Sequence, residues 1–148
     1  MRWLIFIFLF LFGLSFGYSQ TIFTKDSLTI LADSLTLDGS YKMAIVVREQ
    51  ALKKHANASK DYKAYLNAKY HHAKSCDYEF DSYSYHKPDK LITKKVREQY
   101  LDSALQSAIK ARDLLSEMER PDRRFQYEVQ SRINSSIFNR DLLHKKSH

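Results

Sequence analysis

One histidine and the single cysteine of the chain are the residues whose types and spacing best suit chemistry. His72 and Cys76 stand four positions apart, which places both on one face of a helix, a common arrangement for metal ligands. Further ligand types lie nearby: His71, Asp77, Asp81 and His86. Zinc needs three or four ligands in fixed positions, and no HExxH or paired CxxC motif fixes them. We therefore expect no metal site; a small metal-binding protein or hydrolase centred on His72 and Cys76 is the alternative function.

The same two side chains could instead form a nucleophilic pair, because a neighbouring imidazole can lower the pKa of a thiol. Such a pair also needs an orienting group and an oxyanion-binding site, and a chain with three glycines has little with which to build one. No GxSxG, phosphate-binding or dinucleotide-binding motif is present. The sequence therefore predicts neither an enzyme nor a cofactor.

The first residues have the pattern of an export signal. Arg2 is followed by ten apolar residues, and small residues come after them, as far as Ser19. The apolar run spans about 14 residues, fewer than the roughly 20 that a membrane-spanning helix needs. We expect residues 1–19 to be a signal peptide and residues 20–148 to be one exported domain, periplasmic, secreted or on the cell surface of a bacterium. Retention of the run as an anchor stays open, but no later segment is apolar enough to span a membrane.

The charge pattern limits the classes of partner. The net charge is +7, and the basic residues are interleaved with acidic ones rather than gathered in a dense run. This balance favours anionic partners in general, but not nucleic acid, which usually binds concentrated basic segments. A peripheral membrane protein that binds anionic lipids also stays open. With one cysteine, no intramolecular disulfide can form, so the fold must depend on packing.

Helix-breaking residues are scarce after residue 19, where the chain has one glycine and two prolines. This scarcity predicts an all-α domain of about five helices, although a strand for the first element stays open. The expected helices are Thr24–Leu37, Ser40–His55, Lys60–Phe80, Lys90–Met118 and Pro121–Leu143. Gly39 should end the first helix, Ser59 should cap the third, and Pro121 should lie in the first turn of the fifth.

The spacing of apolar residues predicts which helix faces are buried. Leu28, Leu31 and Leu35 share one stripe of the first helix, and Ala44 and Ala51 lie seven residues apart on the second. The longer stripes of the fourth and fifth helices comprise Tyr100, Leu101, Ala104, Leu105, Ala108, Leu115, Met118, Phe125, Val129, Ile133 and Ile137.

With these residues in place, the chain resembles a tetratricopeptide-repeat protein. The matching positions are Leu28, Leu31, Ala32 and Leu35 on helix A, Ala44 and Ala51 on helix B, and Tyr100 to Leu105 with Ala108 and Ala111 on a second helix B. The resemblance implies antiparallel hairpins stacked as a short solenoid that binds a protein or peptide without catalysis. A homodimer through an uncapped terminal helix is compatible with it. Another array of helical hairpins and a closed bundle stay open.

The resemblance also implies a groove lined mainly by A helices. The polar residues that would then face a ligand are Asp26, Thr29, Asp33, Lys63, Asn67, His71 and Lys74. Lys63 and Asn67 repeat a Lys-x3-Asn spacing with which some members of the family bind a peptide's terminal carboxylate. A predicted aromatic loop with Tyr78, Phe80, Tyr83 and Tyr85 would either contact the partner or cover the core of the hairpin.

Overall fold

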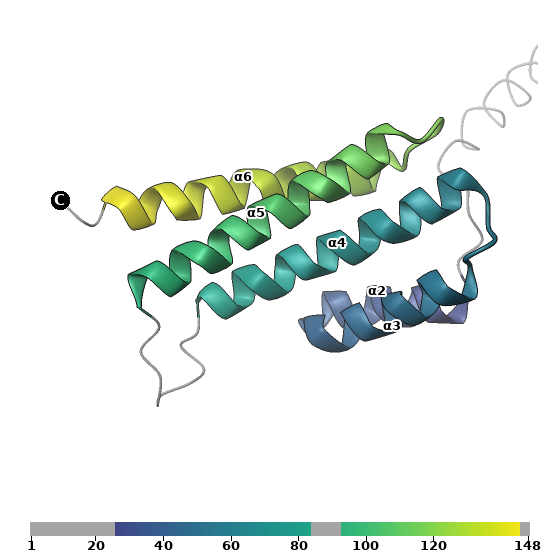
Figure 1. Ribbon diagram of the computed structural model, residues 1–148, viewed down its shortest axis with the longest axis horizontal. Helices are drawn as coiled ribbons and strands as arrows, with labels where there is room; N and C mark the ends of the chain where they lie inside the picture. The colour runs from purple at the N-terminus through teal and green to yellow at the C-terminus, as the bar shows by residue number, and fades with distance from the viewer. Residues whose placement is uncertain (1–25, 84–92, 146–148) are drawn as a thin grey trace, which may run out of the picture.

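The computed structural model describes residues 26–83 and 93–145, which contain five α-helices and no strand (Figure 1). The helices are α2 (Ser27–Leu37), α3 (Tyr41–Lys54), α4 (Lys60–Ser82), α5 (Lys94–Ser116) and α6 (Arg123–Lys145). The prediction of an all-α fold is confirmed. The expected signal peptide, Tyr85 and His86 lie outside the described residues. Among the helices described, none has the length and apolarity to cross a membrane.

The helices pack mainly against their neighbours in the sequence. α2 pairs with α3, α4 pairs with α5, α3 lies against α4, and α6 packs on α5 with a smaller contact to α4. In the view of Figure 1, α2 lies behind α3 and α6 lies behind α5. The predicted stack of helical hairpins is therefore confirmed, and α4 is its central element.

Short polar residues begin the helices by accepting hydrogen bonds from otherwise free backbone N–H groups. The side chains of Asp26, Ser59 and Thr93 each accept a bond from the backbone N–H three residues later, at 3.0, 3.2 and 3.3 Å. Gly39 follows α2 with a φ of +80°, a left-handed conformation that is costly for other residues. The predicted roles of Ser59 and Gly39 are thus confirmed.

The start of α6 differs from the prediction. The helix begins at Arg123, so Pro121 precedes its first turn rather than lying in it. The Oδ1 atom of Asp122 accepts hydrogen bonds from the backbone N–H groups of Arg124 and Phe125, at 3.0 and 3.1 Å. Because Asp122 satisfies these two groups, the helix starts after this residue.

Small residues let the helices approach closely in the core. Ala44, Ala104, Ala108 and Ala111 are all 0% exposed, and Ala51 is 1% exposed. One buried cluster combines alanines of α4 and α5 with larger side chains that include Tyr65, Leu66, Leu105, Leu115, Phe125, Val129 and Ile133. The alanine spacing seen in the sequence therefore marks true helix–helix contacts.

The buried face of α2 agrees only in part with the predicted leucine stripe, because Leu28 and Leu35 are half-buried but Leu31 is exposed. Leu31 is 48% exposed, whereas Thr29 and Ala32 are 4% and 0% exposed. The polar side of α2 faces inward because Arg48 of α3 is buried and bonds to its side chains. A similar shift occurs in α6, where Ile137 is 39% exposed and Ser136 is buried.

Candidate functional site

The seven polar residues predicted to line one groove are divided between two sides of α4. Asp33 of α2 lies 3.5 Å from Lys69 Nζ of α4. Asn67 and His71 each stand two residues from Lys69, so at about 100° per residue they lie on nearly the opposite side of α4. The structure therefore does not bring Asp33 together with Asn67 and His71. We call the side with Tyr65, Lys69, His72, Cys76 and Glu79 the inner face, and the side with Lys63, Asn67, His71 and Lys74 the outer face.

The predicted groove residues of α2 hold helices together. Asp26 Oδ2 lies 2.9 Å from Lys54 Nζ and 2.7 Å from His55 Nε2. Although burial opposes ionisation, the hydrogen bonds with His55 and Lys54 hold the pKa of Asp26 well below its usual value. Thr29 is 4% exposed and has almost no surface to offer a ligand. These contacts fix α2 to the end of α3.

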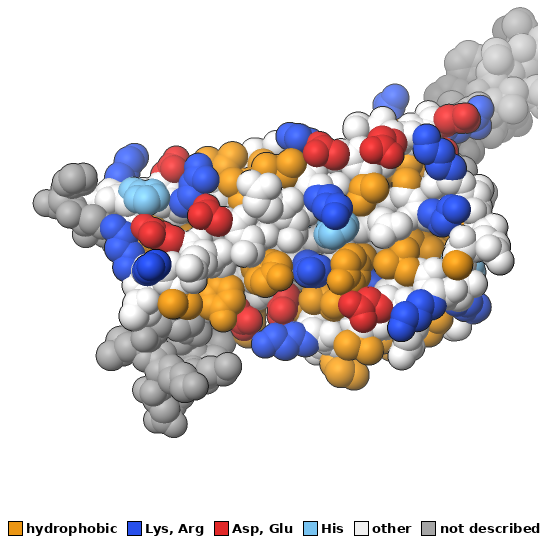
Figure 2. Space-filling model, in the orientation of Figure 1, with side chains coloured by type: hydrophobic (Ala, Val, Ile, Leu, Met, Phe, Trp, Pro, Cys, Tyr) orange, Lys and Arg blue, Asp and Glu red, His pale blue; other side chains and the backbone are white. Residues whose placement is uncertain are grey.

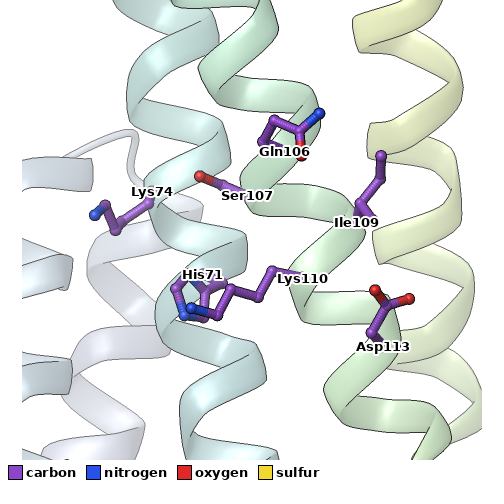
Figure 3. Close-up of a pocket in the computed structure, with 7 residues that line it drawn as sticks. All are labelled: His71, Lys74, Gln106, Ser107, Ile109, Lys110 and Asp113. Carbon is purple, nitrogen blue, oxygen red and sulfur yellow. The ribbon is translucent and has the colours of Figure 1, made fainter.

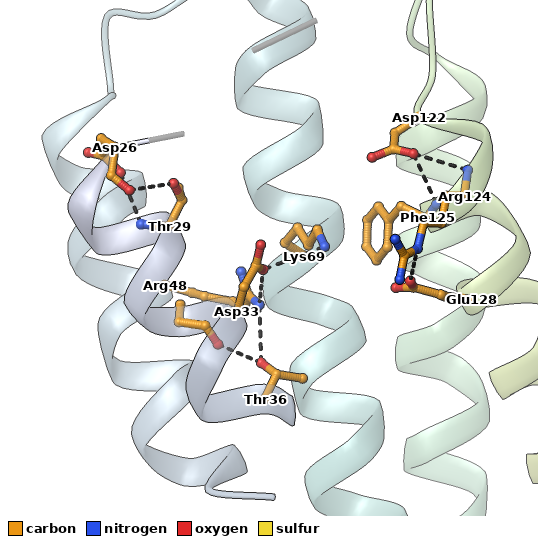
Figure 4. Close-up of polar contacts among 11 residues, drawn as sticks. Asp26, Thr29, Asp33, Thr36, Arg48, Lys69, Asp122, Arg124, Phe125 and Glu128 are labelled. Carbon is orange, nitrogen blue, oxygen red and sulfur yellow. Dashed lines mark hydrogen bonds and ion pairs between the residues drawn. The ribbon is translucent and has the colours of Figure 1, made fainter. Parts of the chain in front are cut away.

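A buried arginine, which the sequence did not reveal, connects α2 and α3 (Figure 4). Arg48 Nη2 donates hydrogen bonds to Asp33 Oδ1 and Thr36 Oγ1, at 3.0 and 3.1 Å, and the Arg48 side chain is 4% exposed. Lys69, which also contacts Asp33, places its Nζ 4.1 Å from the ring centroid of Phe125 in α6. Ion pairing and cation–π contact thus extend from α2 across α4 to α6.

A second polar cluster fixes α6 to α4. Glu79 is 5% exposed and accepts hydrogen bonds from Arg132, Ser135 and Asn139, the last two at 2.9 Å. Burying a carboxylate is costly unless charge and hydrogen bonds compensate it, and these three donors supply both. The cluster is part of the helix packing and is not an open binding surface.

His72 and Cys76 share the inner face, as their spacing predicted. Cys76 is 3% exposed, and burial raises the pKa of its thiol. Burial, followed by nearby Arg132 and Lys69, lowers the pKa of His72 to about 3. These shifts favour the neutral thiol and the neutral imidazole, whereas a nucleophilic pair needs a thiolate. Within residues 26–83 and 93–145, no three His, Cys, Asp or Glu side chains come together to hold a metal.

The outer face of α4 borders a depression of about 310 Å³ between α4 and α5 (Figure 3). Its lining residues are His71, Lys74, Gln106, Ser107, Ile109, Lys110 and Asp113. Neither Lys74 nor Lys110 forms an ion pair with any residue that the structure describes. Asp113 is paired, since its Oδ1 lies 2.8 Å from Arg112 Nη2. The pKa of His71 is lowered to about 4, first by burial and then by the positive charges of Lys110 and Lys74. The depression is therefore positively charged.

Sequence reasoning found only the α4 side of this depression. His71 and Lys74 were among the predicted ligand-facing residues, but the α5 residues were not. A pattern that could have indicated them is the spacing of Gln106, Lys110 and Asp113 at i, i+4 and i+7, which gives α5 one polar stripe. Figure 2 shows basic side chains beside a histidine near the middle of this face, while other basic and acidic side chains are spread around it.

Three of the four aromatic residues predicted to contact a partner lie at the end of α4, and the fourth, Tyr85, lies outside the described residues. Tyr78 and Phe80 belong to the last turns of α4, and Tyr83 is its C-terminal cap. Phe80 packs edge-on against Tyr41 of α3, with ring centroids 5.9 Å apart, and Arg97 of α5 lies 5.5 Å from the ring of Tyr83. The aromatics thus contact α3 and α5, while Phe80 and Tyr83 remain 45% and 38% exposed.

Comparison with known proteins assigns the chain to no family: it matches no family model, no curated protein and no solved structure. Two features then describe the candidate site. The inner face of α4 is filled by polar clusters that join helices, and the outer face carries an open, positively charged depression. The outer face is therefore the candidate binding surface.

Proposed function

We propose that this chain is an exported, non-catalytic, tetratricopeptide-like module that binds a protein or peptide on the outer face of α4 and the adjoining face of α5. The observation that carries the proposal is the depression whose lysines, Lys74 and Lys110, lack ion-pair partners among the described residues. Charged groups without partners on a partly enclosed surface are suited to recognise a complementary segment.

The helices that form this surface are firmly held, which supports binding to a preformed site. α4 packs against α3 and α5, and the Glu79 cluster fixes it to α6. The Arg48 and Lys69 contacts fix it to α2 and α3. A surface that is already ordered loses little conformational entropy when a partner binds, so less of the interaction free energy is offset.

Export and self-association belong to the same proposal. Export follows from the predicted signal peptide at residues 1–19 and would place the module in the bacterial envelope. A homodimer through α6 is supported by the exposed apolar side chains Tyr127, Phe138 and Leu142, which are 78%, 63% and 39% exposed. At about 100° per residue these three side chains lie on one side of α6, and exposed apolar surface that is contiguous marks an interaction site.

The proposal is tested by crosslinking and pull-down mass spectrometry with the purified protein in a native envelope extract. The test variant combines Lys63→Ala with Asn67→Ala; both residues lie on the outer face, where Asn67 Nδ2 donates to the backbone oxygen of Lys63 at 2.9 Å. A matched control combines Lys53→Ala with Asn57→Ala, which have the same spacing and are both exposed at the end of α3 and in the turn after it.

A reproducible protein partner that is lost in the test variant and kept in the control would support the outer face as the binding surface. Capture that neither variant changes would keep the binding module but move its site, and Phe80 and Tyr83 would be tested next. If folded protein captures no partner, the proposed function is wrong.

A further inference from the structure

We propose that the depression between α4 and α5 binds carboxylate groups of an acidic protein segment. The inference rests on the proposed function and deepens it, because it states the chemistry of the partner. Three observations carry it: the charge of the depression, its neutral hydrogen-bond donors, and the extension of positive charge along the outer face.

The charge of the depression is not cancelled within the described chain. Asp113, its one acidic lining residue, is bound by Arg112, whose Nε and Nη2 donate to the same carboxylate oxygen at 3.0 and 2.8 Å. Lys74 keeps its ammonium 5.5 Å and 5.9 Å from the rings of Tyr70 and Tyr78, contacts that orient the charge without neutralising it. Lys74 and Lys110 therefore both remain available to a carboxylate.

Neutral donors accompany the lysines. Gln106 contributes an amide and Ser107 a hydroxyl, and His71 contributes an imidazole that is neutral at pH 7 because its pKa is about 4. In Figure 3 the side chain of Lys110 extends to His71, whereas Asp113 and Ile109 project from another part of α5. A carboxylate beside Lys110 would meet one cation and uncharged donors, whereas the ammonium of Lys74 points away from α5 and is placed to meet a second carboxylate (Figure 3).

Positive charge extends along the outer face from Lys63 to Lys74, and this length favours a segment with several carboxylates over a single small anion. Lys63 and Lys74 lie on the same outer face, and eleven residues of helix separate them by about 16 Å. No single phosphate or carboxylate reaches across that distance, but about five residues of extended peptide do. Lysine is also a point charge without the fork of arginine, so it suits dispersed carboxylates as well as phosphate.

The test is fluorescence anisotropy of a fluorescein-labelled hexaglutamate peptide, with labelled hexalysine as the charge-reversed probe. We expect hexaglutamate to bind, hexalysine not to bind, and the affinity to fall as salt is added. The double variant Lys74→Gln with Lys110→Gln should bind hexaglutamate about tenfold more weakly, because it removes two charge contacts. The matched control, Lys53→Gln with Lys145→Gln, removes two exposed lysines elsewhere and should change the affinity less than about twofold.

A second measurement locates the peptide by NMR titration of the histidine side chains. A carboxylate that binds beside His71 changes the surroundings of its ring, so saturating hexaglutamate at pH 7, where the glutamates are ionised, should shift the ring resonances of His71. His144, which is exposed near the end of α6, is the internal reference and should not change. Inorganic phosphate is the competitor, and the peptide should bind much more tightly than phosphate.

Three outcomes would each overturn the inference. Both double variants weaken the binding of hexaglutamate equally, the His71 signals do not change when the peptide is added, or phosphate binds as tightly as the peptide. These outcomes are distinct from failure of the proposed function. If a native partner is captured and lost in the Lys63→Ala, Asn67→Ala variant, but not in the Lys74→Gln, Lys110→Gln variant, the binding module stands and the acidic-segment inference is wrong.

Discussion

The stability of this protein should decrease as the pH falls from 7.5 to 5, and His72 should be responsible for much of the decrease. His72 is largely buried, with its ring 5.4 Å from that of Phe125. Burial comes first among the causes that lower its pKa to about 3, followed by Arg132, Lys69 and Arg48; Asp33 acts in the opposite direction. The folded protein therefore keeps this imidazole neutral at pH values where the unfolded chain protonates it.

The size of the effect follows from the two pKa values. The unfolded imidazole has a pKa of 6.5, so between pH 6.5 and about 3 the unfolded state binds more protons than the folded state. Each pH unit in that window lowers the free energy of unfolding by about 1.4 kcal/mol. Stability should thus be unaffected by His72 above pH 7 and about 2 kcal/mol lower at pH 5. His71, whose pKa is lowered to about 4, should add a decrease of the same sign.

The assay is urea unfolding followed by far-UV circular dichroism at pH 7.5 and pH 5, with the free energy taken by linear extrapolation. The variant His72→Leu has no titrating group at this position and replaces the ring with an apolar side chain beside Phe125. Whatever its stability at pH 7.5, the free energy of unfolding of this variant should fall by about 2 kcal/mol less than that of the wild type between pH 7.5 and pH 5. The control Leu37→Ala, which removes no titrating group at a position that is 89% exposed, should retain the full pH dependence.

An identical pH dependence in His72→Leu and wild type would refute the reasoning, because the buried imidazole would then not be the group that titrates. A wild type whose stability does not change between pH 7.5 and pH 5 would refute it as well. A variant that is less stable at both pH values by the same amount, with the pH dependence intact, would show that His72 contributes through packing alone.

Three further predictions concern residues that join the helices, and each is measured as the free energy of urea unfolding. Glu79→Gln leaves Arg132, whose side chain is 28% exposed, without its counter-charge and should cost about 2 kcal/mol; a change below about 1 would contradict the assigned role of the pair. Asp122→Ala removes the side chain that accepts two N–H groups at the start of α6 and should cost about 1 kcal/mol, whereas no change would argue against the cap. Ala108→Leu places a larger side chain where exposure is 0% and should cost about 1–3 kcal/mol, while Ala56→Leu at an exposed turn should cost little; equal effects would contradict the close approach of the helices.

Local patterns in the sequence predicted the elements well. The helix ends fall close to the expected positions because they depend on neighbouring residues: the Ser59 cap and the left-handed Gly39 are visible within a few positions of the chain. The alanine positions on α3 and α5 were also predicted, since only a small residue permits close helix contact wherever the partner lies. Leu31 was misplaced, because spacing shows which residues share a face and not which face meets a neighbour.

The candidate site was predicted only in part for the same reason. His71 and Lys74 could be chosen from one helix, but Gln106, Ser107 and Lys110 become their neighbours only when α5 folds back on α4. Asp33 shows the opposite case: the sequence assigned it to the same groove as His71, and its contact with Lys69 places it on the other side of α4.

The sequence alone thus determined the all-helical class, the places where the chain turns and the positions of closest helix approach, because capping, glycine conformation and side-chain size act over a few residues. The tertiary structure decided which polar residues are buried and which remain exposed. Arg48 and Glu79 are charged in a way that usually indicates a surface, yet partners on other helices compensate their burial. Lys74 and Lys110 are charged as well, but they have no ion-pair partner among the described residues and form part of the candidate binding surface.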